Sequence, residues 1–302
     1  MAHDPLARGQ VPGILELPAY RYQHAGYPFL SWILALGRPG LIAWTMIVVN
    51  LLAVLMGTYG AARFLEAEGR RARWAVVYGL SPGLIAAVAL DTSEALAMAF
   101  CVWGLLAYRR GRPVASALWL AGASLTKEIF VLVALALLVY HLWQRRNAWP
   151  MHRLLPYLLP FFVPAVWSQY LRTRIPGTAL QGGFSLAPPF VGILRTLRMA
   201  ADHAFGSPDQ MQLAFGQIPL LAALLALSAL GVVRALRHPS LAGTVFLAFA
   251  ALFTLLDWWA LLYPKDLWRI LAPLLVLLPL ALASEKSPAV GSPQEYATSS
   301  AV

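Results

Sequence analysis

Long apolar stretches separated by short basic loops constrain the fold of this chain more than any other feature. Of its 302 residues, 60% are hydrophobic and 12% are charged, whereas a soluble domain has about 25% charged residues. Stretches such as 41–62 and 218–235 are long enough to cross a bilayer, because a membrane helix needs about 20 apolar residues. The sequence therefore predicts an all-α, polytopic transmembrane helical bundle with about eight or nine membrane helices.

Further membrane segments are expected wherever the same apolar pattern recurs. Residues 29–36 are too few to span the hydrocarbon core and are expected to form an interfacial or re-entrant helix. Ser81-Pro82-Gly83 predicts a kink in the second span. Residues 190–199 have one apolar side and two arginines, which is typical of an interfacial amphipathic helix. The other expected membrane segments are 74–90, 95–108, 113–125, 129–143, 154–171, 241–256 and 267–282.

The distribution of basic residues predicts the orientation of these segments. Thirteen of the 23 basic residues lie in alternate short connections, and cytoplasmic loops are enriched in Lys and Arg. That side is therefore expected to be cytoplasmic, which explains the net charge of +10 without a nucleic-acid partner. The thirteen residues are Arg63, Arg70, Arg71, Arg73, Arg109, Arg110, Arg112, Arg145, Arg146, Arg153, Arg234, Arg237 and Lys286.

This orientation divides the chain into three parts with different expected locations. Residues 1–27 are expected to form a polar, non-cytoplasmic arm, residues 28–283 the transmembrane helical domain, and residues 284–302 a disordered cytoplasmic tail. Within the transmembrane domain, residues 173–217 are expected to be a non-cytoplasmic loop that contains the amphipathic helix.

Charged residues interrupt the apolar pattern on the opposite, non-cytoplasmic side. The groups are Asp91-Thr92-Ser93-Glu94, Thr126-Lys127-Glu128, and Asp257 with the segment 265–269. An ionisable residue at the edge of a membrane segment is costly and often marks a functional site. Together with Tyr20-Arg21-Tyr22-Gln23 from the arm, these groups are expected to lie on one face of the membrane.

Each group also has a purely structural explanation. Asp91-Thr92-Ser93-Glu94 fits a capping box, with Asp91 as the N-cap and Glu94 as the third helical residue. The capping box and a ligand role are equally compatible with these residues. Lys127 and Glu128 either snorkel to the interface or belong to a site. Lys265 and Arg269 share a helix face, where they either anchor the membrane end or bind a phosphate.

Asn50, Cys101 and the histidines are not expected to bind a ligand or a metal ion. Asn50, inside the first span, is expected to hold helices together rather than to bind a ligand. Cys101, the only cysteine, is expected to be a packing residue in an apolar segment. The six histidines share no metal-binding spacing, so no histidine metal site is predicted.

Six short segments cover most of residues 18–283 in a specific order. They are Pro18-Ala19-Tyr20-Arg21-Tyr22-Gln23, Tyr27-Pro28-Phe29-Leu30, Tyr78-Gly79-Leu80-Ser81-Pro82-Gly83, Asp91-Thr92-Ser93-Glu94, Leu125-Thr126-Lys127-Glu128 and Asp266-Leu267-Trp268-Arg269-Ile270-Leu271-Ala272-Pro273-Leu274. In combination they resemble the bacterial GT-C-type membrane glycosyltransferases, in the branch related to GPI-type mannosyltransferases. The resemblance implies an enzyme that moves a hexose, with mannose as one candidate, from a polyprenyl-phosphate donor to a cell-envelope acceptor. It also implies transfer on the non-cytoplasmic face of the bacterial inner membrane, with inversion and an acidic base.

The resemblance further implies roles for the charged groups. Asp91 and Glu94 would be the catalytic acids, near the acceptor or near a bound divalent cation. Arg269 and Lys265 would bind the lipid phosphate as negative charge builds on it. Lys127 and Glu128 would join them in the donor site, and the substrate pocket would contain Arg21, Tyr22, Asp257 and Asp266.

The chain departs from this family pattern at its beginning. Family members have a first span and then an outer loop with a catalytic Asp, often as Tyr-Asp-Gly, and nothing similar precedes Tyr20. The expectation is therefore that the sequence is a truncated reading of a longer protein, whose missing segment supplies the base. Without that segment, Asp4 or Asp91 would have to replace it.

The alternative class is a non-enzymatic integral membrane protein, such as a transporter or flippase subunit or a partner in envelope assembly. A transporter is expected to show internal repeats with broken helices at corresponding positions. No such repeat is recognisable in the sequence, and the charged groups gather on one side rather than at the midplane. These two observations favour the enzyme.

Overall fold

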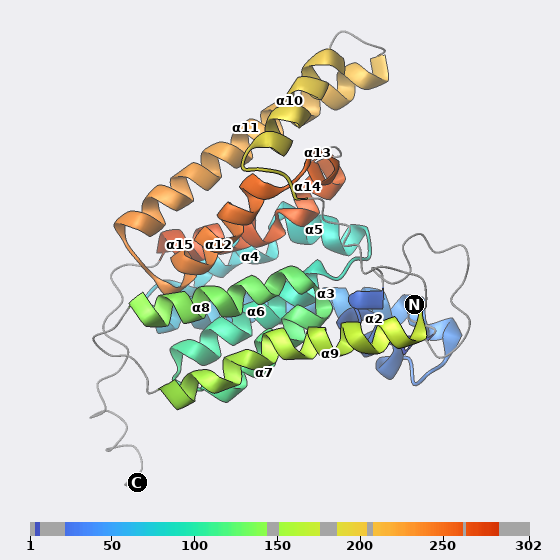
Figure 1. Ribbon diagram of the computed structural model, residues 1–302, viewed down its shortest axis with the longest axis vertical. Coiled ribbons are helices and arrows are strands. Elements are labelled where there is room, and N and C mark those ends of the chain that lie inside the picture. Colours follow the sequence, from blue (N-terminus) through green and yellow to red (C-terminus); the bar gives the residue numbers. More distant parts are fainter. Residues whose placement is uncertain are drawn as a thin grey trace.

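The computed structural model describes residues 4–6, 22–143, 151–175, 186–203, 208–261 and 264–283. Within these ranges the regular secondary structure is helical, and the β pairing consists of one isolated antiparallel bridge between Leu186 and Leu256. The all-α expectation is therefore confirmed for the described part of the chain. Figure 1 shows most helices running roughly side by side, while α10 (Val191–His203) and α11 (Pro208–Arg237) extend away from them.

Three helices in the described residues are long and apolar enough to cross a membrane, namely Pro39–Ala67, Arg153–Arg174 and Gly216–Arg237. A fourth candidate is the broken pair Ala72–Gly79 and Pro82–Ala89, which is bent by 44°. The remaining apolar helices have 10–17 residues. These findings indicate an integral membrane protein, but they identify fewer full-length spans than the eight or nine expected from the apolar pattern.

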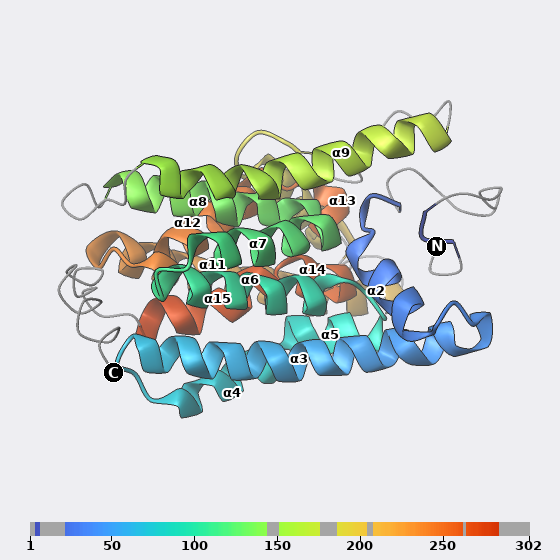
Figure 2. The same ribbon diagram turned by 90° about the horizontal axis from the view of Figure 1, so that it is seen from below.

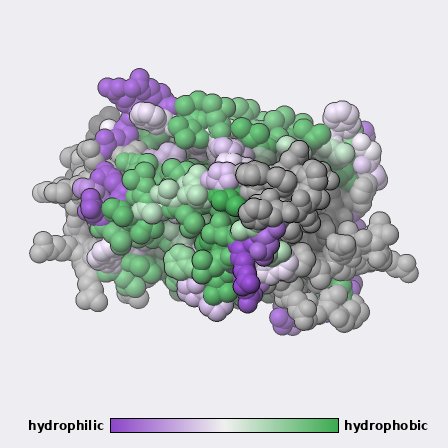
Figure 3. All heavy atoms as spheres, turned by 90° about the horizontal axis from the view of Figure 1, so that it is seen from above, coloured by the Kyte–Doolittle hydropathy of each residue, from purple (hydrophilic) through white to green (hydrophobic). Residues whose placement is uncertain are grey.

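The outer surface also fits a lipid environment. Large apolar side chains are exposed on α3 (Ile42–Ala67) and elsewhere, with Trp44 69% and Leu55 65% exposed. Figure 3 shows apolar side chains over the middle of the visible face and hydrophilic ones in separate patches. A soluble protein rarely exposes apolar surface on this scale, because water disfavours it.

The first described helix is the short one expected near residue 29. α2 spans Gly26–Leu34, and the chain then turns at Leu36 and Gly37, whose φ angles are +52° and +70°. A Cβ atom on Gly26 would overlap the side chain of Thr126. The absence of that atom lets the first turn of α2 lie directly against the end of α7 (Pro113–Thr126).

The kink predicted at Ser81-Pro82 is confirmed. The segment before it contains η2 (Ala72–Ala75) and α4 (Val76–Gly79), and α5 (Pro82–Ala89) follows. Pro82 begins α5, where its missing N–H costs no helical hydrogen bond. A Cβ atom on Gly83 would lie 2.6 Å from Ala272 Cα and 2.7 Å from the Trp268 carbonyl oxygen. This glycine therefore allows α5 to pack closely on the junction of α14 (Pro264–Ile270) and α15 (Ala272–Ala283).

α6 (Glu94–Arg109) lies in the centre of the bundle, and 13 of its 16 residues are buried. Figure 2 shows α3 on one side and α9 (Leu159–Arg174) on the other, with α6 and α7 between them. The break predicted after α7 is confirmed: Lys127 has an extended backbone, and η3 (Glu128–Phe130) and α8 (Val131–Trp143) follow. α7 and α8 form two short, packed helices joined at the charged residues.

The remaining helices differ from the expectation mainly at one boundary. η5 (Met151–Leu158) precedes α9, and α12 (Leu241–Leu255) and α13 (Trp258–Leu261) precede α14. The helix expected to begin at residue 218 begins at Pro208, so the last part of the predicted loop 173–217 belongs to α11. The polar composition of 208–217 suggested a loop, but proline is favourable in the first turn of a helix.

Candidate functional site

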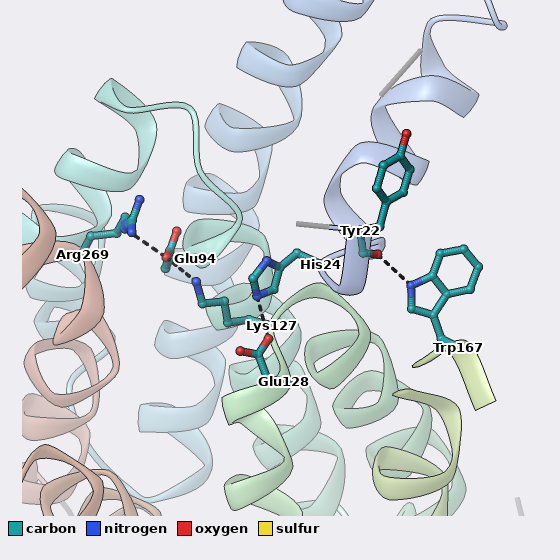
Figure 4. A network of polar contacts seen from close by, with 7 residues as sticks. All are labelled: Tyr22, His24, Glu94, Lys127, Glu128, Trp167 and Arg269. Carbon is teal, nitrogen blue, oxygen red and sulfur yellow. Dashed lines mark hydrogen bonds and ion pairs between the residues drawn. The ribbon is translucent and has the colours of Figure 1, made fainter. Parts of the chain in front are cut away.

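Glu94, Lys127 and Arg269 meet in one buried cluster, which we call the charged cluster. Lys127 Nζ donates to Glu94 Oε1 at 3.0 Å, and Arg269 Nε lies 3.3 Å from the same oxygen. The side chains of Glu94 and Lys127 are 3% and 8% exposed, and that of Arg269 is 25% exposed. Figure 4 shows the three side chains converging from separate helices. Two cations beside one carboxylate stabilise its ionised form, so the cluster is held together by charge.

Each member of the charged cluster is positioned by the end of a helix. Glu94 is the first residue of α6, Lys127 lies in the extended break after α7, and Arg269 lies in the last turn of α14. The close contact of Gly83 with Trp268 and Ala272 brings α14 against α5, the helix that precedes the connection into α6. The cluster therefore depends on the packing of segments that are far apart in the sequence.

The structure contradicts the capping box, one of the two interpretations of Asp91-Thr92-Ser93-Glu94. The N-cap of α6 is Ser93, and Asp91 instead follows the end of α5 with a left-handed φ of +51°. The Asp91 N–H donates to the Val88 carbonyl, and the Thr92 N–H donates to the Ala87 carbonyl. This pair of bonds is a Schellman motif, in which a left-handed residue ends a helix and satisfies its last carbonyls. Asp91 thus terminates α5 rather than starting α6.

Asp91 forms a second polar group, separate from the contacts of the charged cluster. Its Oδ1 accepts hydrogen bonds from the Tyr27 hydroxyl and from Asn50 Nδ2, the latter at 3.2 Å. Asn50 Nδ2 also lies 2.8 Å from the Tyr27 hydroxyl. These contacts link α2, α3 and the connection between α5 and α6. The expected role of Asn50 in holding helices together is therefore confirmed, and Asp91 has a structural role in the same group.

Glu128 pairs with a histidine that the sequence analysis did not assign to the site. His24 Nε2 lies 2.6 Å from Glu128 Oε2, and the two side chains are 14% and 36% exposed. Burial alone would raise the pKa of the Glu128 carboxyl, but the hydrogen bond and charge of His24, together with the charge of Lys127, outweigh it and lower this pKa. The position of His24 directly after the Tyr20–Gln23 segment was the sequence signal that could have suggested its involvement.

Asp257 and Tyr22 make contacts elsewhere. Asp257 Oδ1 accepts from the Trp258 N–H at 2.8 Å at the start of α13, and it lies 3.7 Å from Arg195 Nη1 of α10. Tyr22 is buried, and its carbonyl accepts from Trp167 Nε1 at 2.9 Å. Burial, followed by the negative charge of Asp4, raises the pKa of the Tyr22 hydroxyl. Figure 4 shows Tyr22 on the far side of His24 from Glu94, so this tyrosine attaches the arm to α9.

Three other predicted site residues cannot be placed. Arg21 lies outside the described residues, and so do the side chains of Lys265 and Asp266, although both belong to α14. Among the described residues, no group of three His, Cys, Asp or Glu side chains is arranged to hold a metal ion. Asp91 and Glu94 therefore do not belong to such a group.

An apolar cavity of about 180 Å³ lies among α2, α3, α6 and α7. Its wall includes Leu96, which follows Glu94 by two residues on α6. The other wall residues are also apolar and include Leu30, Val49, Met56, Phe100 and Trp103. Leu34, Leu52 and Met56 of this wall are about half exposed, so the cavity opens at the outer surface of the bundle.

The fold and the charged cluster define an all-α protein with candidate membrane-spanning helices and buried ion pairs at the junctions of those helices. No family model matches this chain, and neither the curated proteins nor the solved structures include one with significant similarity to it. The function is therefore argued from the cluster itself.

Proposed function

We propose that this chain is a GT-C-type membrane glycosyltransferase that takes a hexose from a polyprenyl-phosphate donor. The proposed acceptor is a cell-envelope component on the non-cytoplasmic face of the bacterial inner membrane. The observation that carries the proposal is the convergence of Lys127 and Arg269 on the buried Glu94. Lys265 would add a further cation to the donor site, and Arg21 and Asp266 would belong to the substrate pocket.

The two cations suit a phosphate leaving group. When the bond between the sugar and the phosphate breaks, negative charge builds on the lipid phosphate, and nearby cations stabilise that charge. Arg269 can offer two parallel N–H donors to phosphate oxygens, while Lys127 acts as a point charge. Glu94 holds both cations in place before the donor binds, because each lies within 3.3 Å of its Oε1.

The apolar cavity supports a lipid-linked donor rather than a soluble sugar nucleotide. A prenyl chain is purely apolar, and the cavity wall consists of apolar side chains beside Leu96 on α6. The cavity opens at the outer surface of the bundle, where a prenyl chain could enter it from the lipid. A soluble nucleotide would instead need polar groups at the same place.

A non-enzymatic role is the second candidate, because buried ion pairs can also be structural. The Glu94–Lys127 pair joins α6 to the break between α7 and α8, so it would stabilise a transporter or assembly subunit equally well. The two candidates differ in one property: only the enzyme needs the charge of Arg269 for sugar transfer.

The direct test is transfer of labelled hexose from a polyprenyl-phosphate donor by the purified full chain in nanodiscs, with solubilised bacterial membranes as the acceptor source. We expect transfer by the wild type, a loss of at least tenfold in Arg269→Gln, and partial activity in Arg269→Lys. Arg195→Gln is the matched control, because Arg195 is an exposed arginine whose ion pair is with Asp257. Unchanged transfer in a folded Arg269→Gln variant would overturn the phosphate assignment. Absence of transfer by the wild type would favour the non-enzymatic role.

A further inference from the structure

Glu128 and His24 form a carboxylate–imidazole pair next to the charged cluster. His24 Nε2 lies 2.6 Å from Glu128 Oε2, and Glu128 directly follows Lys127 in the break after α7. Figure 4 shows Arg269, Glu94, Lys127 and Glu128 in a row, with Arg269 and Glu128 at the two ends. The row thus has a cation at one end and a carboxylate at the other.

The other two carboxylates of this region are committed to structural contacts. Glu94 is 2% exposed and its Oε1 lies between two cations. Asp91 accepts hydrogen bonds from Tyr27 and Asn50 and has the left-handed backbone that ends α5. A substrate could reach Glu94 only if this burial were relieved, and protonation of Asp91 at Oδ1 would break its contacts with Tyr27 and Asn50.

Glu128 differs from Glu94 in its exposure, and it has no part in ending a helix, as Asp91 does. Its side chain is 36% exposed, although its Oε2 is buried against His24. Figure 4 shows its second oxygen pointing away from His24. The backbone that supports the pair is also well defined, because Gly26, two residues after His24, packs directly against Thr126, two residues before Glu128.

From this arrangement we propose that Glu128, held in position by His24, accepts the proton of the hydroxyl group to which the sugar is transferred. This inference rests on the proposed function. In the step, the acceptor oxygen forms a bond to the anomeric carbon of the sugar, and the bond from that carbon to the phosphate oxygen breaks. The phosphate oxygen keeps the electron pair, and the hydroxyl proton moves to Glu128.

The positions of the two ends of the row fit this step. Inversion requires the acceptor to attack from the side opposite the leaving phosphate. Arg269 at one end can neutralise the phosphate, and Glu128 at the other end can face the acceptor. His24 is a positioning residue: its Nε2–H directs one oxygen of Glu128 and leaves the other for the acceptor.

The experiment compares Glu128→Gln, Glu128→Asp, His24→Gln and His24→Phe with the wild type in the nanodisc transfer assay. Donor binding is measured separately with labelled polyprenyl-phosphate hexose and no acceptor. We expect Glu128→Gln to lower kcat at least 100-fold while donor binding changes less than threefold, and Glu128→Asp to keep more activity. Glu66→Gln is the control, because Glu66 is an exposed glutamate that pairs with Arg63 at the far end of α3.

The role of His24 is tested by whether its substitution changes kcat or KM. His24→Gln keeps an N–H donor and is expected to retain most of the activity, whereas His24→Phe is expected to lower kcat at least tenfold without raising KM for the donor. His24→Phe should also shift the acidic limb of the pH–rate profile, because the contacts of His24 and Lys127 with Glu128 lower the pKa of its carboxyl.

The outcomes separate this inference from the proposed function. If the wild type transfers sugar and Glu128→Gln keeps more than a third of its rate, the assignment of Glu128 is wrong while the proposed function stands. If Glu128→Gln loses donor binding together with transfer, Glu128 belongs to the donor site and the inference fails. If the wild type transfers no sugar from this donor, both proposals fail.

Discussion

Lys127 Nζ and Glu94 Oε1 lie 3.0 Å apart, and both side chains are almost completely buried. A buried pair of this kind joins the break after α7 to the first turn of α6. Because the desolvation of each charge is offset only by its partners, the loss of one partner is more damaging than the loss of both. This asymmetry gives the first prediction.

We expect Lys127→Met or Glu94→Leu to lower the free energy of unfolding by about 3–5 kcal/mol. The double variant should be more stable than the sum of the two single changes predicts, because it leaves neither of these two charges buried without its partner. Thermal unfolding of the purified protein in detergent measures the three values. Strictly additive losses would show that the pair is not energetically coupled.

Asp91 provides a test of the Schellman motif at the end of α5. Its φ of +51° is unfavourable for a residue with a Cβ atom, by about 1–2 kcal/mol. Asp91→Gly and Asp91→Ala both lose the side-chain hydrogen bonds, but only glycine removes the backbone penalty. We therefore expect the Gly variant to unfold at a higher temperature than the Ala variant, whereas a capping box would give no such advantage to glycine.

The hydroxyl of Tyr27 should contribute measurably to stability. Tyr27→Phe removes a group that contacts Asp91, Asn50 and the Met46 carbonyl. The loss removes a hydrogen bond to the Asp91 carboxylate, which costs about 1–3 kcal/mol, and leaves Asp91 and Asn50 with their contact to each other. Tyr59→Phe is the control, because Tyr59 is 55% exposed on the same helix as Asn50. Equal unfolding temperatures for the two variants would contradict this role of Tyr27.

Gly83 should be sensitive to a small increase in size. A methyl group there would come within 2.6 Å of Ala272 Cα, so α5 would have to move away from α14. We expect Gly83→Ala to reduce stability by about 1–3 kcal/mol and to weaken the contact of Arg269 with Glu94. Gly40→Ala is the matched control, since no atom lies within 4 Å of a Cβ placed there. The comparison requires only unfolding curves of both variants.

The stability contribution of Glu128 should depend on pH in one direction. Its pKa in the folded protein lies below the ordinary value of 4.5, so its contribution is present above that value and is lost as the pH falls through the folded pKa. The difference in unfolding temperature between the wild type and Glu128→Gln should therefore shrink between pH 7 and pH 3. A difference that grows on acidification would mean that the sign of the pKa shift is wrong.

The proposed orientation can be tested with single cysteines, because the native Cys101 is buried. Gly40 and Glu66 are exposed positions near the two ends of the span Pro39–Ala67. In intact cells of an outer-membrane-permeable strain, an impermeant maleimide should label Gly40→Cys but not Glu66→Cys. The reverse pattern would place the charged cluster on the cytoplasmic side.

The class of structure and the interruptions of its helices could be predicted from the sequence alone. Long apolar stretches predict helices in lipid, proline after Ser81 predicts the kink, and Lys127 with Glu128 predicts the break between two short helices. Each of these depends on local chemistry, since a charge or a missing N–H acts on its own segment. The structure confirms the helical class, the kink and the break.

The pairing of the charged residues, in contrast, could not be predicted without the folded structure. The four residues from Asp91 to Glu94 were compatible with a capping box, but Asp91 has a left-handed conformation and its side chain contacts Tyr27 and Asn50 from other helices. The pairing of Glu94 with Lys127 and Arg269, and of His24 with Glu128, depends on contacts between segments far apart in the chain. Sequence patterns give information about residues that are close together in the chain. These pairs depend instead on the close packing of α2 on α7 and of α5 on α14. Gly26 and Gly83 permit that packing because neither has a Cβ atom.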